Sequence, residues 1–283
     1  MKGRRIKLTA GCLLMIAAMG TVLFPRICDQ ISRIRLLKEA YEALVQEDCE
    51  TYEEAVLYNE KIARLQAERP FAYAGAEAGE RDKEYLSLPA GGSETLCWVE
   101  VPAANIYLPV GHGTREKILA REAGHMYGTS IPVGGDSVHA VIAAHTGLAG
   151  ARLFTDLADV RKGDPVLIHL GARTLHYRVD AVNVVRPEEE SRYLQIIPGE
   201  DYVTLYTCTP IGKNTHRLLV RAKRSSQEET ADDREDGKAG IIEKRNKAWQ
   251  LLFLEGASVF LIPVSLCVLA GRGGRNSRYR NSA

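Results

Sequence analysis

The first chemically suggestive feature of the sequence is a cysteine followed closely by an arginine. Cys208 ends a run of strand-forming residues, 201–207, and after a Pro- and Gly-containing turn residues 215–221 can return beside it as a second strand. Facing residues of such a hairpin lie roughly 5 Å apart, so we expect Arg217 close to Cys208. A guanidinium favours the thiolate over the thiol and can stabilise the oxyanion formed when a thiolate attacks a carbonyl. The pair therefore predicts a nucleophilic cysteine.

A nucleophilic cysteine also needs a group that gives a proton to the leaving amine, and histidine is the usual one. His145 follows the apolar run Val138–Ala144, and the end of a strand is where a side chain can emerge into a cleft. His216, beside Arg217, is a weaker second candidate. We expect structural roles for His125, His169 and His176. Spacing alone leaves the alternative of a buried core cysteine, a surface arginine and a turn histidine.

Short strand-like runs surround these residues. They are 97–101, 105–110, 138–144, 165–170, 174–185, 202–207 and 217–221, with short helical pieces near 115–122 and 151–157. Many short strands with turn residues between them predict a mainly β domain built as a closed or nearly closed barrel. Residues 30–66 carry apolar residues at helical spacing, including Tyr52, Val56, Ile62 and Leu65, and predict a helical arm packed on that domain. Pro70 ends the helical pattern, and a loop is expected over 72–81.

Two apolar segments flank the domain. Residues 8–24 contain no charge and predict a membrane anchor near the minimum spanning length, the alternative being a cleaved signal peptide. Residues 249–270 predict a second span, although Glu255 within it is costly in hydrocarbon, and a peripheral amphipathic tail is the alternative. Basic residues lie outside both segments, so we expect both termini in the cytoplasm and the domain between them on the extracellular face of the cell membrane.

Composition excludes several classes of function. The formal net charge is +1 because 36 acidic residues nearly balance 37 basic ones, which argues against a nucleic-acid binder. Of six cysteines, only Cys49, Cys97 and Cys208 lie in the exported part, so a disulfide framework is not expected, although a Cys49–Cys97 bridge stays open. No zinc-binding spacing and no phosphate-binding loop occurs, and we expect no metal or organic cofactor.

Several of these stretches together resemble the sortase family. Thr204–Cys208 resembles the T-L-x-T-C signature of sortases, and Thr215–Arg221 resembles the arginine strand that follows it. Gly124–Ser130 and Leu153–Leu157 also resemble stretches of that family. The similarity covers roughly residues 30–224 and is closest to class C, the pilin-polymerising sortases, which the two flanking membrane segments also suit.

The resemblance implies an eight-stranded sortase barrel with a catalytic trio. Cys208 would be the nucleophile, His145 the general acid/base, and Arg217 the group that stabilises the thiolate or the oxyanion. The implied reaction cleaves the Thr–Gly bond of a Leu-Pro-x-Thr-Gly-like sorting signal and transfers the acyl group to an amine, in class C a pilin lysine. The expected partners are pilins or surface proteins with such signals, the amine acceptor and the membrane. The alternatives are a sortase that attaches single proteins to peptidoglycan and a non-catalytic adaptor that binds sorting signals.

Class C sortases carry a lid with Asp-Pro and an aromatic residue, and here the matching segment is Arg69-Pro70-Phe71. Phe71 could cover Cys208, but the carboxylate that the lid would offer to Arg217 is lost, and Glu68 is the nearest substitute. We therefore expect a more easily opened lid. The predicted organisation is a cytoplasmic stub and anchor over 1–28, an arm and lid over 29–90, the catalytic barrel over 91–224, a polar linker over 225–247, and a membrane segment with a basic tail over 248–283.

Overall fold

The computed structural model describes residues 50–88, 95–148, 150–171 and 173–225, together with Thr21, Phe24, Cys28, Ile31 and Gln250. Residues 50–225 belong to one compact unit that runs from residue 36 to residue 242, while residues 1–35 and 243–283 form another. Apart from three of those single residues, both expected membrane segments lie outside the described part, as do Cys49 and nearly all of the 225–247 linker. Within the described part, no helix is long and apolar enough to cross a membrane.

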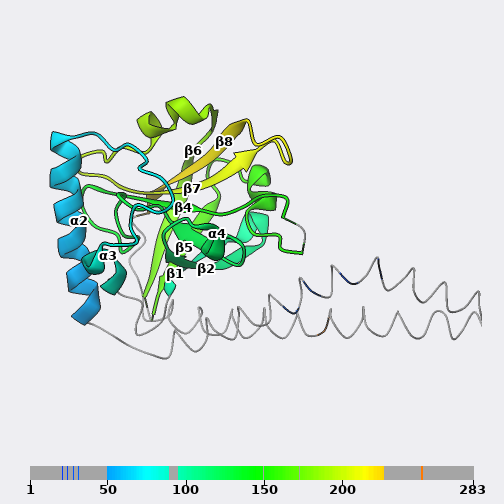
Figure 1. Ribbon diagram of the computed structural model, residues 1–283, viewed down its shortest axis with the longest axis horizontal. Helices are drawn as coiled ribbons and strands as arrows, with labels where there is room; N and C mark the ends of the chain where they lie inside the picture. Colours follow the sequence, from blue (N-terminus) through cyan, green and yellow to red (C-terminus); the bar gives the residue numbers. More distant parts are fainter. Residues whose placement is uncertain are drawn as a thin grey trace, which may run out of the picture. The chain divides into compact units, whose positions relative to one another are not determined.

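Eight strands close into a barrel, as the resemblance implied (Figure 1). They are β1 Thr95–Val101, β2 Ile106–His112, β3 Ala123–His125, β4 Val138–Ala143, β5 Pro165–Leu170, β6 Arg173–Val185, β7 Asp201–Thr209 and β8 His216–Arg224. Their order around the barrel is β1-β2-β3-β4-β7-β8-β6-β5. The apolar runs of the sequence predicted seven of the eight. β3 was missed because three residues are too few to show an alternating pattern.

The alternation of side chains decides which residues of β7 reach the outside of the barrel. Val203 and Leu205 are buried in its core, beside Val220 of β8 and Ile142 of β4. Residues of opposite parity therefore point outward, and Cys208 is among them. The Cys208 side chain therefore lies on the outer face of the barrel, and the interior of the barrel is filled by packed apolar side chains.

In the described part of the chain, two helices pack beside the barrel. Helix α2 (Glu50–Glu68) stands along one side of it, and α3 (Lys83–Ser87) lies close to α2 (Figure 1). The buried face of α2 carries Ala55, Tyr58 and Ile62, which share an apolar cluster with Leu96 at the start of β1. This confirms the predicted packing of the arm for the described residues. Leu65 is an exception, because its side chain is 52% exposed.

Short helices occupy the connections of the barrel. They are η1 Pro102–Ala104, α4 Glu116–Leu119, η2 Thr155–Asp159 and η3 Pro187–Tyr193. Of the two predicted helical pieces, the first is α4 and the second is the 3-10 helix η2, which begins later than the sequence indicated. Residues 72–81 form neither helix nor strand, as expected. Helix η3 matters most for the site because it connects β6 to β7.

Candidate active site

Cys208 and Arg217 face each other across the β7–β8 hairpin. The antiparallel register pairs them directly, as the sequence predicted. Arg217 is held on three sides: its Nε donates to the hydroxyl of Tyr206 at 2.7 Å, and its Nη1 donates to the carbonyls of Asn214 at 3.0 Å and His216 at 3.2 Å. The hairpin therefore brings a fixed guanidinium beside a half-buried, free thiol.

His145 reaches the same place from β4. This strand runs parallel to β7, and their last registered pair is Ala143 with Tyr206. The chains stay together beyond that pair, because the Ala144 amide donates to the Tyr206 carbonyl at 3.1 Å and Thr207 Oγ1 donates to the Ala144 carbonyl at 2.7 Å. Two steps past Ala143 and Tyr206, the same register sets His145 beside Cys208, on chains about 4.8 Å apart.

The imidazole of His145 has a carboxylate partner. Its Nε2 lies 3.0 Å from Oε2 of Glu116, which comes from α4. The Glu116 side chain is 76% exposed and that of His145 is 33% exposed. An exposed contact of this kind contributes little stability, so it orients the ring more than it holds the fold together.

A buried carboxylate completes the surroundings of Arg217. Glu190, in η3, accepts a 2.7 Å hydrogen bond from the hydroxyl of Tyr206 and lies 3.7 Å from Arg217 Nε. Burial and the hydrogen bond to Glu190 raise the pKa of Tyr206, so that side chain stays a neutral phenol. Burial by itself would lower the pKa of Arg217, but Tyr206, Cys208 and Glu190 outweigh it and raise that pKa. The arginine therefore remains a cation beside the thiol.

The predicted lid segment lies on the outer face of the barrel. Phe71 is only 6% exposed, and its backbone amide and carbonyl make hydrogen bonds of 2.8 and 2.9 Å to the side-chain amide of Gln195. Its ring belongs to an apolar cluster with Met126, Val141, Val185, Leu194 and Leu219, and Tyr206 packs against that cluster. Pro70, Arg69 and Glu68 are exposed. In the described part of the chain, the carboxylate paired with Arg217 is that of Glu190, so the suggestion that Glu68 takes this role was wrong.

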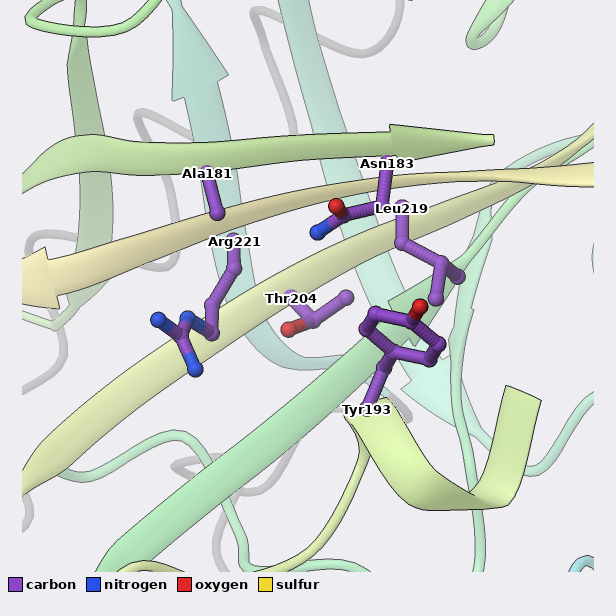
Figure 2. Close-up of a pocket in the computed structure, with 6 residues that line it drawn as sticks. All are labelled: Ala181, Asn183, Tyr193, Thr204, Leu219 and Arg221. Atoms are coloured by element: carbon purple, nitrogen blue, oxygen red, sulfur yellow. The ribbon is translucent and has the colours of Figure 1, made fainter. Parts of the chain in front are cut away.

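A hollow of about 190 Å³ opens on the same outer face, and Cys208 is not among the residues that line it (Figure 2). Thr204 is one of the residues that line it and lies between Arg221 and Tyr193. Cys208 is four residues farther along β7 than Thr204, a distance of about 13 Å. Arg221 is already held by Asp180, through bonds of 3.0 and 2.6 Å.

Two further histidines are buried and structural. They are His125, for which the sequence predicted a structural role, and His139. Burial lowers the pKa of each to about 4. His169 lies 3.0 Å from Glu100, and His216 lies 3.0 Å from the hydroxyl of Thr215. The register pairs His169 with Trp98 and Thr174, away from Cys208, whereas it pairs His216 with Thr209, the residue next to Cys208 in β7. Cys97 is a free thiol inside the barrel core, and burial raises its pKa.

Sequence reasoning missed Glu190, Gln195 and His139. Glu190 stands in the run Glu188-Glu189-Glu190, and a run of acidic residues normally indicates a solvated surface. Only the 3-10 turn of η3 directs the third of these carboxylates inward, where it is 9% exposed. For Gln195 the sequence offered one weak indication that the side chain faces the protein, namely its position directly after the apolar Leu194.

Comparisons with known proteins agree with this geometry. A family model described as a sortase domain matches residues 99–225. The sortase C of Streptococcus pneumoniae is 35% identical, with a TM-score of 0.57 over 69% of this chain and 99% of that one. A lid mutant of sortase A from Corynebacterium diphtheriae is 37% identical, with a TM-score of 0.57 over 65% of this chain and 96% of that one. Sortase A of Bacillus anthracis is 26% identical over 124 residues, or 43% of this chain, and the match spans just over half, 56%, of that relative.

Proposed function

This chain belongs to the sortase family, and on that premise we propose that it is a membrane-anchored cysteine transpeptidase acting on Leu-Pro-x-Thr-Gly-like sorting signals. The observation that carries the proposal is the meeting of three chain segments at one point of the outer barrel face. Cys208 and Arg217 are cross-strand partners, and the β4–β7 register brings His145 to the same place. A thiol, a cation and an imidazole so arranged suit acyl transfer.

The proposed reaction has two halves. The thiolate of Cys208 attacks the carbonyl carbon of the threonine in the signal, and the oxyanion that forms is stabilised by the Arg217 guanidinium. The C–N bond to glycine then breaks as His145 gives its proton to the departing amine, which leaves a thioester. In the second half an acceptor amine attacks the thioester carbonyl and loses a proton to His145, and the C–S bond breaks to return the thiolate.

We propose a lysine side chain of a pilin as the acceptor, and hence pilus polymerisation. Support comes from the pneumococcal relative, which is described together with its pilin substrate specificity, and from the C. diphtheriae relative, which is described with a lid. The segment around Phe71 is the counterpart proposed here for that lid. The two apolar segments at 8–24 and 249–270 support membrane anchoring at the extracellular face, with both termini in the cytoplasm.

The test uses the full chain in detergent with a fluorogenic Leu-Pro-x-Thr-Gly peptide and hydroxylamine as a small acceptor. We expect cleavage between threonine and glycine with formation of a threonyl hydroxamate, and loss of both products in Cys208→Ala. Cys97→Ala is the matched control, because that thiol is buried inside the barrel away from the outer face. No cleavage by the wild-type chain would contradict the proposal and favour a non-catalytic adaptor. Equal cleavage by Cys208→Ala would contradict Cys208 as the nucleophile.

The acceptor is tested separately. A lysine-bearing pilin domain and a peptidoglycan stem peptide are offered at equal concentration to the acyl-enzyme. Preferential formation of the pilin isopeptide supports the pilin proposal, whereas preferential transfer to the stem peptide would assign the chain to the attachment of single surface proteins.

A further inference from the structure

Arg217 has a buried carboxylate neighbour, Glu190, that does not belong to the β7–β8 hairpin. The side chain of Glu190 is 9% exposed and that of Arg217 is 22% exposed, and their 3.7 Å contact is bridged by the hydroxyl of Tyr206. A carboxylate taken out of water is costly unless charged or hydrogen-bonding partners compensate it. Here both kinds of partner converge on it, so the chain compensates a carboxyl group at this point.

The bridge also decides which atoms of the guanidinium stay available. Nε is occupied by Tyr206, and Nη1 is occupied by the carbonyls of Asn214 and His216. An arginine presents its donors in a rigid planar fork, so fixing two of the three nitrogens fixes the third. Nη2 therefore carries the donors left for an oxyanion near Cys208.

The same carboxylate moderates the charge that Cys208 experiences. The groups around the thiol are Arg217 and His216 on β8, His145 after β4 with its partner Glu116, and Tyr206 on β7. Glu190, from η3, adds a negative charge behind the arginine. Removing that charge leaves the guanidinium uncompensated, which favours the thiolate, and at the same time frees the guanidinium to turn.

We propose that Glu190 and Tyr206 are positioning residues that hold Arg217 in the orientation required for oxyanion stabilisation, with the counter-charge supplied by η3 of the barrel domain and independent of the lid segment. This inference deepens the proposed function and rests on it for the catalytic readout. It separates two effects of one arginine, namely the charge that acts on the thiol and the orientation that acts on the reacting carbonyl.

The experiment compares Glu190→Gln and Tyr206→Phe with the wild-type full chain in detergent. Glu189→Gln is the matched control, because it makes the same chemical change one residue away in η3, at an exposed side chain. One readout is the pH midpoint of Cys208 alkylation by iodoacetamide, followed by peptide mapping, and it needs no substrate. The other is kcat and KM for peptide cleavage.

For Glu190→Gln we expect the alkylation midpoint to fall by about 0.5 pH unit, since a negative charge near the thiol is removed. We expect kcat to fall about 10-fold, with KM changed less than 2-fold, because an interaction used in the transition state is weakened. For Tyr206→Phe we expect a similar loss of kcat. Glu190→Asp keeps the carboxylate, so its alkylation midpoint should equal that of the wild type. The control should change neither readout.

An unchanged midpoint together with an unchanged kcat in Glu190→Gln would overturn the inference, since a purely structural acid would move only the melting temperature. If Glu190→Gln fails to fold, Tyr206→Phe decides through kcat, because it removes the hydroxyl that joins Glu190 to Arg217, and a wild-type kcat there would overturn the inference. If the wild-type chain cleaves no sorting peptide, the proposed function fails, whereas the alkylation midpoint still tests whether Glu190 acts on Cys208.

Discussion

The docking of Phe71 on the outer face of the barrel predicts how easily the site opens. Phe71 is 6% exposed, and its ring lies on the apolar cluster that includes Leu219 and touches Tyr206, two residues before Cys208. Phe71→Ala should shift the lid segment from the docked to the undocked state. We expect peptide cleavage to become faster as a result, because the segment then leaves the face that the substrate must reach.

The magnitude follows from what the substitution removes. Burying a phenylalanine side chain contributes up to about 3 kcal/mol, and an alanine retains one methyl group of it, so docking should weaken by about 2 kcal/mol. That is a shift of roughly 30-fold in the docking equilibrium, which sets the ceiling for the gain in kcat/KM. The two hydrogen bonds between the Phe71 backbone and Gln195 survive the change. Gln195→Ala, which removes them at about 1 kcal/mol each, should therefore act in the same direction.

The assay measures kcat/KM for the sorting peptide and the rate at which a bulky maleimide labels Cys208. Leu65→Ala is the control. Leu65 is an apolar residue shortly before the lid segment in sequence, but it is already 52% exposed, so its removal should not change docking. Global melting should change little, because the undocked segment is a local opening. Cleavage and labelling rates equal to wild type in both Phe71→Ala and Gln195→Ala would refute the reasoning, since Phe71 would then not limit access to Cys208.

Two further predictions concern the barrel and its arginine. Burial lowers the pKa values of His125 and His139 to about 4, below the roughly 6.5 of an unfolded chain, so the unfolded state binds more protons and stability falls as the pH drops from about 6.5 towards 4. We expect a loss of about 2 kcal/mol per histidine between pH 7 and pH 5 in urea unfolding, and a flat profile in that window would contradict buried, neutral rings. Arg217→Lys keeps the charge but loses the fork that reaches Tyr206 and two backbone carbonyls, so kcat should fall about 100-fold with KM within a few-fold. A kcat close to wild type would show that the charge alone suffices.

The site could be predicted in part because some of its contacts are local. Cys208 and Arg217 belong to one hairpin, whose turn and alternation set their register within a short stretch of chain. His145 could be placed at a strand end, but its position beside Cys208 depends on the parallel pairing of β4 with β7, which joins residues far apart in the sequence. Spacing along the chain carries no information about such a pairing, so the strand end made His145 a candidate partner and the resemblance to sortases assigned it to Cys208.

By itself, the sequence determined seven of the eight strands, the hairpin that joins the thiol to the guanidinium, and the helical arm that Pro70 ends. These follow from periodicity and turn residues, which act between near neighbours. Only the tertiary structure decided that Glu190 turns inward to Tyr206 and Arg217, and that Gln195 holds the backbone of Phe71. The partners in the second contact are 124 residues apart, and a buried polar group takes its partner from whatever side chain the closed barrel brings near it.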